Sequence, residues 1–149
     1  DVSLDSSNLG IMGASKGALS ALNTAMEYPE LFGFVGCIST HWIGIKPSEY
    51  LLLPFNGLLN RKPIIADEVT IEAIIKYSGI NASNLKDKKV YFDYGTEGLD
   101  YFYPEPQARI NKIFDSYQIE YMFKTNEGQG HEPKYFGSRF IDALQYLIN

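Results

Sequence analysis

The stretch of sequence that decides the fold is Leu9-Gly10-Ile11-Met12-Gly13-Ala14-Ser15-Lys16-Gly17. An apolar run, residues 9–12, leads here into a Gly-x-Ser-x-Gly pattern, whose small residues suit a tight turn between a strand and a helix. After the turn, apolar residues recur at helical spacing until Pro29, and alanines fill the same helical turns. A short apolar run at residues 34–38 then predicts a strand buried on both faces. Strand, turn, helix and strand in this order predict a βαβ unit.

The rest of the chain continues the alternation of helices and strands. The patterns predict helices over residues 69–77, 104–117 and from Phe136 onward, strands over 90–94 and 119–123, a polar loop over 81–89 and an aperiodic apolar segment over 42–65. The second of these strands alternates apolar and polar residues, as strands near a sheet edge do. The 149 residues suffice for one domain. We therefore expect a single α/β domain over residues 1–149, with a mostly parallel sheet flanked by helices.

Composition excludes several classes of function. The net charge of −5 opposes binding to nucleic acid, and no apolar run reaches the length of a membrane span. The chain has a single cysteine, Cys37, whose apolar neighbours predict a buried core residue, and no Cys/His cluster has the spacing of zinc ligands. We expect no metal and no cofactor. The residues leave the cellular compartment open.

Ser15 is the candidate nucleophile. A serine at a sharp strand-to-helix turn is held in a strained, exposed conformation, and small residues flank it because strand and helix nearly touch. The amides at the start of the following helix can then stabilise an oxyanion. The alternative interpretation is a glycine-rich turn with an idle serine.

The chain offers two histidines as the general base. His131 follows the last predicted strand in the glycine-rich turn Gly128-Gln129-Gly130, which matches the nucleophile, acid, histidine order of α/β-hydrolases. His41 lies beside Trp42 after the second strand, where a pocket-wall or core position is favoured. We therefore predict His131 as the base and His41 and Trp42 as substrate-binding residues.

The acid that orients the base is expected after the strand at 90–94. Asp93 lies inside that strand, too early for a loop acid, although it could brace the turn. Glu97 and Asp100 both lie past Gly95. We favour Asp100 and keep Glu97 as the alternative.

Three motifs together resemble one known family. Residues 11–19 with 27–33, residues 91–100 and residues 128–132 resemble the nucleophile, acid and histidine regions of the putative-esterase family, which includes esterase D and the enterochelin and feruloyl esterases. The resemblance implies an α/β-hydrolase fold and a serine carboxylic-ester hydrolase that forms an acyl-enzyme with Ser15, His131 and Asp100 as its triad. The backbone amide of Lys16 would be one oxyanion donor, and the substrate would be a small-molecule ester.

The sequence departs from the family pattern at the front. Complete α/β-hydrolases carry several strands and a second oxyanion loop before the nucleophile, whereas Ser15 comes after fourteen residues. We therefore expect that the N-terminal strands are missing, that a further segment or a second copy completes the sheet, and that this chain alone has weak activity. The segment from Trp42 to Leu59 is a candidate lid or pocket wall. Two alternatives stay open, a non-catalytic esterase-like binding module and an acyltransferase that uses the same triad.

Overall fold

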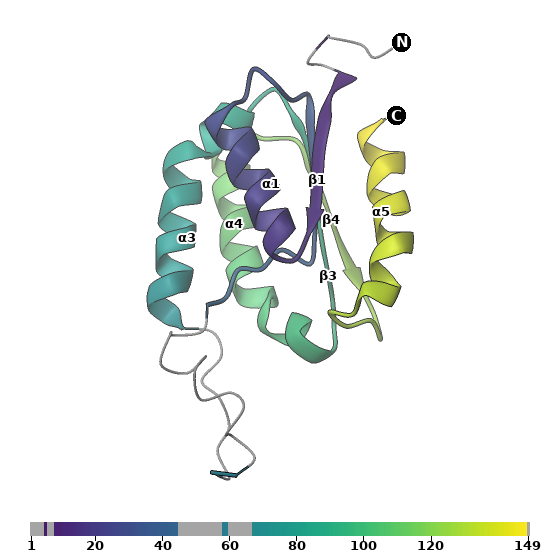
Figure 1. Ribbon diagram of the computed structural model, residues 1–149. Coiled ribbons are helices and arrows are strands. Elements are labelled where there is room, and N and C mark those ends of the chain that lie inside the picture. The colour runs from purple at the N-terminus through teal and green to yellow at the C-terminus, as the bar shows by residue number, and fades with distance from the viewer. Residues whose placement is uncertain (1–4, 6–7, 45–57, 60–66, 149) are drawn as a thin grey trace.

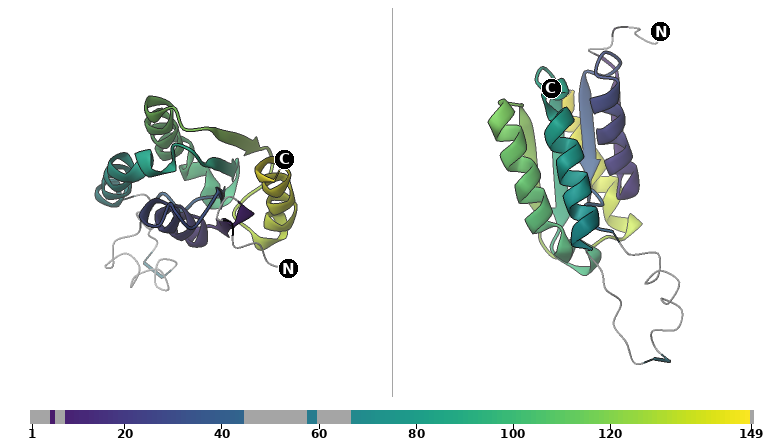
Figure 2. Two further views of the ribbon diagram at one scale, coloured as in Figure 1. Left: turned by 90° about the horizontal axis from the view of Figure 1, so that it is seen from above. Right: turned by 90° about the vertical axis from the view of Figure 1, so that its left-hand side faces the viewer.

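A parallel four-stranded sheet forms the centre of the computed structural model, which describes residues 5, 8–44, 58–59 and 67–148. The strands are β1 (Gly10–Ala14), β2 (Phe34–Ile38), β3 (Lys89–Gly95) and β4 (Tyr121–Asn126), paired in that order. Helices α1 (Lys16–Glu27), α3 (Glu68–Asn81) and α4 (Pro104–Tyr117) cover one face, and α5 (Pro133–Leu147) covers the other (Figures 1 and 2). The α/β fold class is confirmed.

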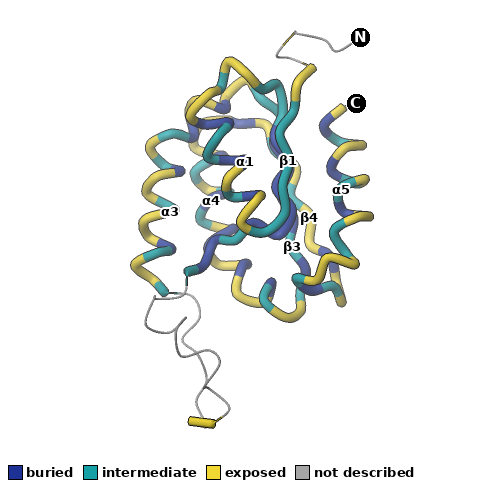
Figure 3. The backbone as a smooth tube through the Cα atoms, in the orientation of Figure 1, coloured by how far each residue is buried: buried dark blue, intermediate teal, exposed yellow. Residues whose placement is uncertain are grey.

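Burial follows the layers of the fold. A large cluster of buried side chains lies between the sheet and α1, α3 and α4, and a smaller one lies between the sheet and α5. Figure 3 colours the backbone by how far each residue is buried. The Phe92 ring is central to the large cluster, since it contacts the rings of both Trp42 and Phe114. Cys37 is buried with a free thiol, as expected. Each buried aromatic side chain stabilises the folded state by about 2–3 kcal/mol.

The structure corrects one expectation about secondary structure, and a second expectation falls mostly outside the described residues. The predicted polar loop is wrong over residues 81–85, because α3 runs to Asn81 and a 3-10 helix, η3 (Ala82–Leu85), follows it. Ala82 and Leu85 are buried and anchor this turn to the core, a contact that the polar composition conceals. The aperiodic segment over 42–65, including the candidate lid, lies mostly outside the described residues.

All four strands point the same way, so their carboxyl ends meet at one end of the sheet. Ser15 follows β1, Ser39 follows β2, and His131 follows β4 in the loop before α5. A short 3-10 helix, η4 (Gly98–Phe102), follows β3 and carries Asp100. β1 and β4 form the two edges of the sheet among the described residues.

Candidate active site

Ser15 lies in a strained turn between β1 and α1. Its backbone has φ 58° and ψ −126°, a region that residues other than glycine rarely adopt. The turn is held by hydrogen bonds: the Ser15 amide donates to the Ile38 carbonyl at 2.9 Å, and the Ser15 carbonyl accepts from the His41 amide at 3.2 Å. These two hydrogen bonds stabilise the strained backbone conformation of Ser15 and thereby fix the position of its hydroxyl.

The glycines that flank Ser15 have different roles. A Cβ on Gly13 would lie 2.2 Å from the carbonyl oxygen of Gly17, so strand and helix do nearly touch at Gly13. A Cβ on Gly17 would meet nothing within 4 Å. The expectation that both positions must be small is therefore confirmed at Gly13 and wrong at Gly17, which lies on the outer side of the helix start.

His131 joins the serine to a carboxylate. Its Nε2 lies 2.7 Å from the Ser15 Oγ, and its Nδ1 lies 2.6 Å from Asp100 Oδ1. The loop that carries His131 is tied to the acid loop, because the Glu97 amide donates to the Gln129 carbonyl at 3.0 Å. A Cβ on Gly95 would lie 2.0 Å from the same carbonyl oxygen, so glycine permits this close approach. With Nδ1–H donating to the carboxylate, Nε2 is free to accept the serine proton.

Asp100, and not Glu97, faces His131. Asp100 is fully buried and also accepts hydrogen bonds from the Ser39 hydroxyl and, at 2.7 Å, from the Gly95 amide. Glu97 is exposed. Burial of Asp100 raises its pKa, but the hydrogen bonds from His131, Ser39 and the Gly95 amide lower it, and the pKa lies below its usual value. Asp100 is therefore a carboxylate that His131 can use as an acceptor.

His41 reaches the same cluster through Tyr103. The hydroxyl of Tyr103 lies 3.1 Å from His41 Nδ1 and 3.4 Å from His131 Nδ1. Burial, the positive charge of Lys16 and the proximity of His131 together lower the pKa of His41 to about 4. His41 is therefore neutral at neutral pH and adds no charge beside the serine.

Comparison with known proteins shows the family of this chain. The model of the family described as Putative esterase matches residues 2–147. This chain belongs to the Putative esterase family. No curated protein sequence gives a significant match.

Several of the solved structures that resemble this esterase-family chain carry the names of esterases or serine hydrolases, and another is a puromycin-hydrolyzing peptidase. A ferulic acid esterase has a TM-score of 0.67 at 19% identity, over 98% of this chain and 52% of its own length. The fluorophosphonate-binding serine hydrolase FphF of Staphylococcus aureus has a TM-score of 0.64 at 14% identity, over 99% and 57%. The enterochelin esterase of Shigella flexneri has a TM-score of 0.62 at 17% identity, over 97% and 32%. This chain thus spans about half the length of the first two, and the likeness shows that they share its fold.

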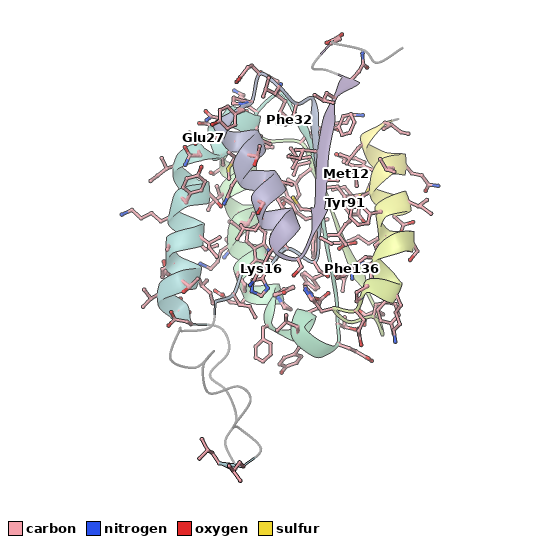
Figure 4. All side chains as sticks on the ribbon, viewed as in Figure 1. Met12, Lys16, Glu27, Phe32, Tyr91 and Phe136 are labelled. Carbon is pink, nitrogen blue, oxygen red and sulfur yellow. The ribbon has the colours of Figure 1, made fainter. Side chains whose placement is uncertain are left out.

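A cavity of about 480 Å³ opens beside the nucleophile turn of this esterase-family chain. Its described lining comprises Lys16, Leu19, Ser20, His41, Ile43, Gly44, Thr70 and Ile74. Figure 4 places Lys16 and Phe136 at the same end of the sheet, with Glu27 and Phe32 at the opposite end. His41 lines this cavity, and its role in substrate binding stays a prediction. The cavity combines apolar walls with a few polar groups, as small-molecule sites do.

Trp42 lies in the core and not on this cavity wall. The side chain is 1% exposed, its indole donates to Gln107 Oε1 at 2.8 Å, and its ring contacts Phe92. His41 lines the cavity whereas Trp42 is buried in the core, so these two neighbours in sequence lie in different environments. The structure therefore assigns Trp42 to packing, and its predicted role in substrate binding has no support in the geometry.

Three residues of the site were not predicted from the sequence. Ser39 has a positive φ of 44°, follows β2 and bonds to Asp100, and its position after a strand was a signal that could have been used. Tyr103 and Arg139 come from an aromatic run and from the middle of α5, with no local pattern that marks them. Among the described residues, no group of three or more His, Cys, Asp or Glu side chains could hold a metal ion, and no helix is long and apolar enough to cross a membrane.

Proposed function

We propose that the protein is a serine esterase that cleaves a carboxylic ester through an acyl-enzyme, with Ser15, His131 and Asp100 as its triad. One observation carries the proposal: a continuous chain of hydrogen bonds, 2.7 Å and 2.6 Å long, joins the serine hydroxyl to the imidazole and the imidazole to the carboxylate. The three residues come from loops after three different strands, separated by up to 116 residues in sequence. Such a constellation has the geometry that nucleophilic catalysis requires.

The mechanism follows from the roles of these groups. His131 Nε2 accepts the hydroxyl proton as Ser15 Oγ attacks the ester carbonyl, and Asp100 stabilises the imidazolium. The tetrahedral oxyanion receives a hydrogen bond from the Lys16 amide at the start of α1. His131 then gives the proton to the leaving alcohol. In the second half of the reaction, His131 activates a water that releases the acid and frees Ser15.

The substrate is proposed to be a small-molecule ester that occupies the cavity beside Lys16 and His41. The similar structures include a ferulic acid esterase and an enterochelin esterase, which supports a carboxylic ester as the substrate class. The chemistry needs no metal or organic cofactor, because proton transfer and covalent catalysis come from side chains alone.

Hydrolysis of p-nitrophenyl acetate tests the proposal. We expect wild-type protein to release nitrophenolate, and Ser15→Ala, His131→Gln and Asp100→Asn each to lower kcat by at least about 10³-fold. Ser138→Ala, an exposed serine on α5, is the matched control and should keep wild-type activity. Equal turnover by wild type and Ser15→Ala would refute the proposal. Ester product from an added alcohol would indicate an acyltransferase, and ligand binding without turnover would indicate a binding module.

A further inference from the structure

A buried arginine lies behind the proposed triad. Arg139, from the middle of α5, is 1% exposed, and the two carboxylates beside it, Asp93 and Asp100, are both fully buried. A charged side chain is almost never buried unless it is paired, because leaving water costs several kcal/mol. The pairing of this arginine therefore needs an explanation.

Asp93 holds the guanidinium in place. Arg139 Nε donates to Asp93 Oδ2 at 2.9 Å, and Nη2 donates to Asp93 Oδ1, so the pair is bidentate. The other nitrogen, Nη1, lies 3.6 Å from Asp100 Oδ2 and is buried without a hydrogen-bond partner among the described residues. The positive charge is thus anchored on one carboxylate and directed at the triad acid.

Ser39 links the two carboxylates. Its hydroxyl donates to Asp100 Oδ2 and accepts from Arg139 Nη2 at 2.6 Å, while its amide donates to Asp93 Oδ1 at 3.0 Å. The Ser39 hydroxyl and the Gly95 amide both donate to Asp100 Oδ2, so the second oxygen, Oδ1, is the one that remains for His131. The network therefore determines which oxygen faces the base.

We propose that Arg139 is a positioning residue which, anchored by Asp93 and Ser39, fixes the orientation and the charge of Asp100 behind His131. This inference rests on the proposed function and extends it to a buried ion network outside the triad. It predicts that charge changes at Asp93 and Arg139 reach the base through Asp100, with opposite signs.

Other titratable groups face this network. The Tyr91 hydroxyl lies 3.4 Å from Asp93 Oδ2. Burial and the charge of Asp93 keep the pKa of Tyr91 well above its usual value, and the same two causes raise the pKa of Cys37. On the far side, Tyr103 and His41 face His131, and both are neutral at neutral pH. The charges that can act on the base from within the network are therefore those of Asp93, Asp100 and Arg139.

Three variants separate charge from packing. Asp93→Asn removes a negative charge and leaves Arg139 to pair with Asp100 alone, which disfavours imidazolium at His131. Arg139→Met removes the positive charge and favours imidazolium, whereas Arg139→Lys keeps the charge and loses the bidentate bond. All three should lower thermal stability. Arg109→Met, which removes an exposed ion pair with Glu72, is the matched control.

The measurement is the midpoint pH at which the His131 imidazole signals shift in an NMR titration of untagged protein. The chain has two histidines, so the signals that remain in His41→Gln are those of His131. We expect this midpoint to fall by about 1 pH unit in Asp93→Asn, to rise by about 1 pH unit in Arg139→Met, and to stay near the wild-type value in Arg139→Lys and Arg109→Met. The acid limb of kcat/KM for p-nitrophenyl acetate should shift in the same directions.

Because the NMR readout needs no turnover, it separates failure of this inference from failure of the esterase proposal. Variants that lose stability while the midpoint stays fixed would overturn the inference and leave Arg139 with a purely structural role.

Discussion

At the scale of single residues, the site depends on backbone geometry that the chain enforces at Ser15. A serine at φ 58° costs on the order of 1–3 kcal/mol, and the amides of Ser15 and His41 supply the hydrogen bonds that hold it there. The position of the serine was predictable because small residues and a following helix mark the turn within a few positions. The partners of Asp100 were not, because Ser39 and Arg139 lie 61 and 39 residues away along the chain and no local pattern links them.

A substitution at Lys16 distinguishes the role of its backbone amide from the role of its side chain. The proposed oxyanion donor is its amide, so Lys16→Ala should keep kcat/KM for a neutral ester within about threefold of wild type, since the amide remains. Steady-state kinetics with p-nitrophenyl acetate measures this. A fall of 10²-fold or more, which is about what the loss of one oxyanion donor costs, would show that the ammonium group takes part.

His41 should make folding stability depend on pH. Its pKa is about 4 in the folded protein, against 6.5 for an ordinary histidine side chain, so the unfolded chain binds a proton first as the pH falls. Stability from this group is complete above about pH 6.5 and is lost as the pH falls toward 4, by about 1–2 kcal/mol once the partial exposure of the ring is allowed for. Urea unfolding of wild type and His41→Gln between pH 4 and 7 tests this. A pH dependence that is the same in both would contradict the assignment.

At the scale of elements, the predicted strands and helices were located by periodicity, and the errors lie where tertiary contacts override composition. The helix over Pro104–Tyr117 matches α4 because its apolar residues repeat at helical spacing and proline marks its start. Residues 81–85 look polar, yet the buried side chains of Ala82 and Leu85 turn them into the end of a helical segment. Trp42 was assigned to the pocket from its place beside His41, but its direction is set by Gln107 and Phe92, which are distant in sequence.

The contact between β1 and α1 makes a prediction about two glycines. Gly13→Ala places a Cβ 2.2 Å from a backbone oxygen, so the strand and helix must separate; we expect a loss of about 3 kcal/mol or more in unfolding free energy and a fall in activity. Gly17→Ala is the control, with open space around the new Cβ and a gain of up to about 1 kcal/mol from helix propensity. Thermal unfolding of both variants measures the difference. Equal effects would show that the close approach at Gly13 is absent.

At the scale of the whole molecule, the fold gathers loops from one end of a parallel sheet around Ser15, while the two hydrophobic clusters hold the layers together. The order of the motifs along the chain was enough to predict this arrangement, because parallel strands bring their carboxyl ends to one side. How far each side chain is buried was not predictable from that order, because burial depends on how α4 and α5 pack on opposite faces of the sheet.

Trp42 offers a probe of this packing. As the single tryptophan of the chain, with 1% of its side chain exposed, it should emit at short wavelength and should shift to the red in one transition with the loss of helical circular dichroism. Trp42→Phe should lower the unfolding free energy by about 1–3 kcal/mol, because it leaves a cavity and the unpaired Oε1 of Gln107, while KM for a small ester is unchanged. A large rise in KM with unchanged stability would contradict the packing role and indicate that Trp42 binds the substrate.

The most direct test of the central claim is the mass of the protein after reaction with a fluorophosphonate. The account predicts one adduct per chain, located by peptide mass spectrometry on Ser15, formed rapidly by wild type and at least about 10³-fold more slowly by His131→Gln, because the imidazole that activates the hydroxyl is gone. An adduct on another residue, or labelling of Ser15 at the same rate with and without the His131 imidazole, would contradict it.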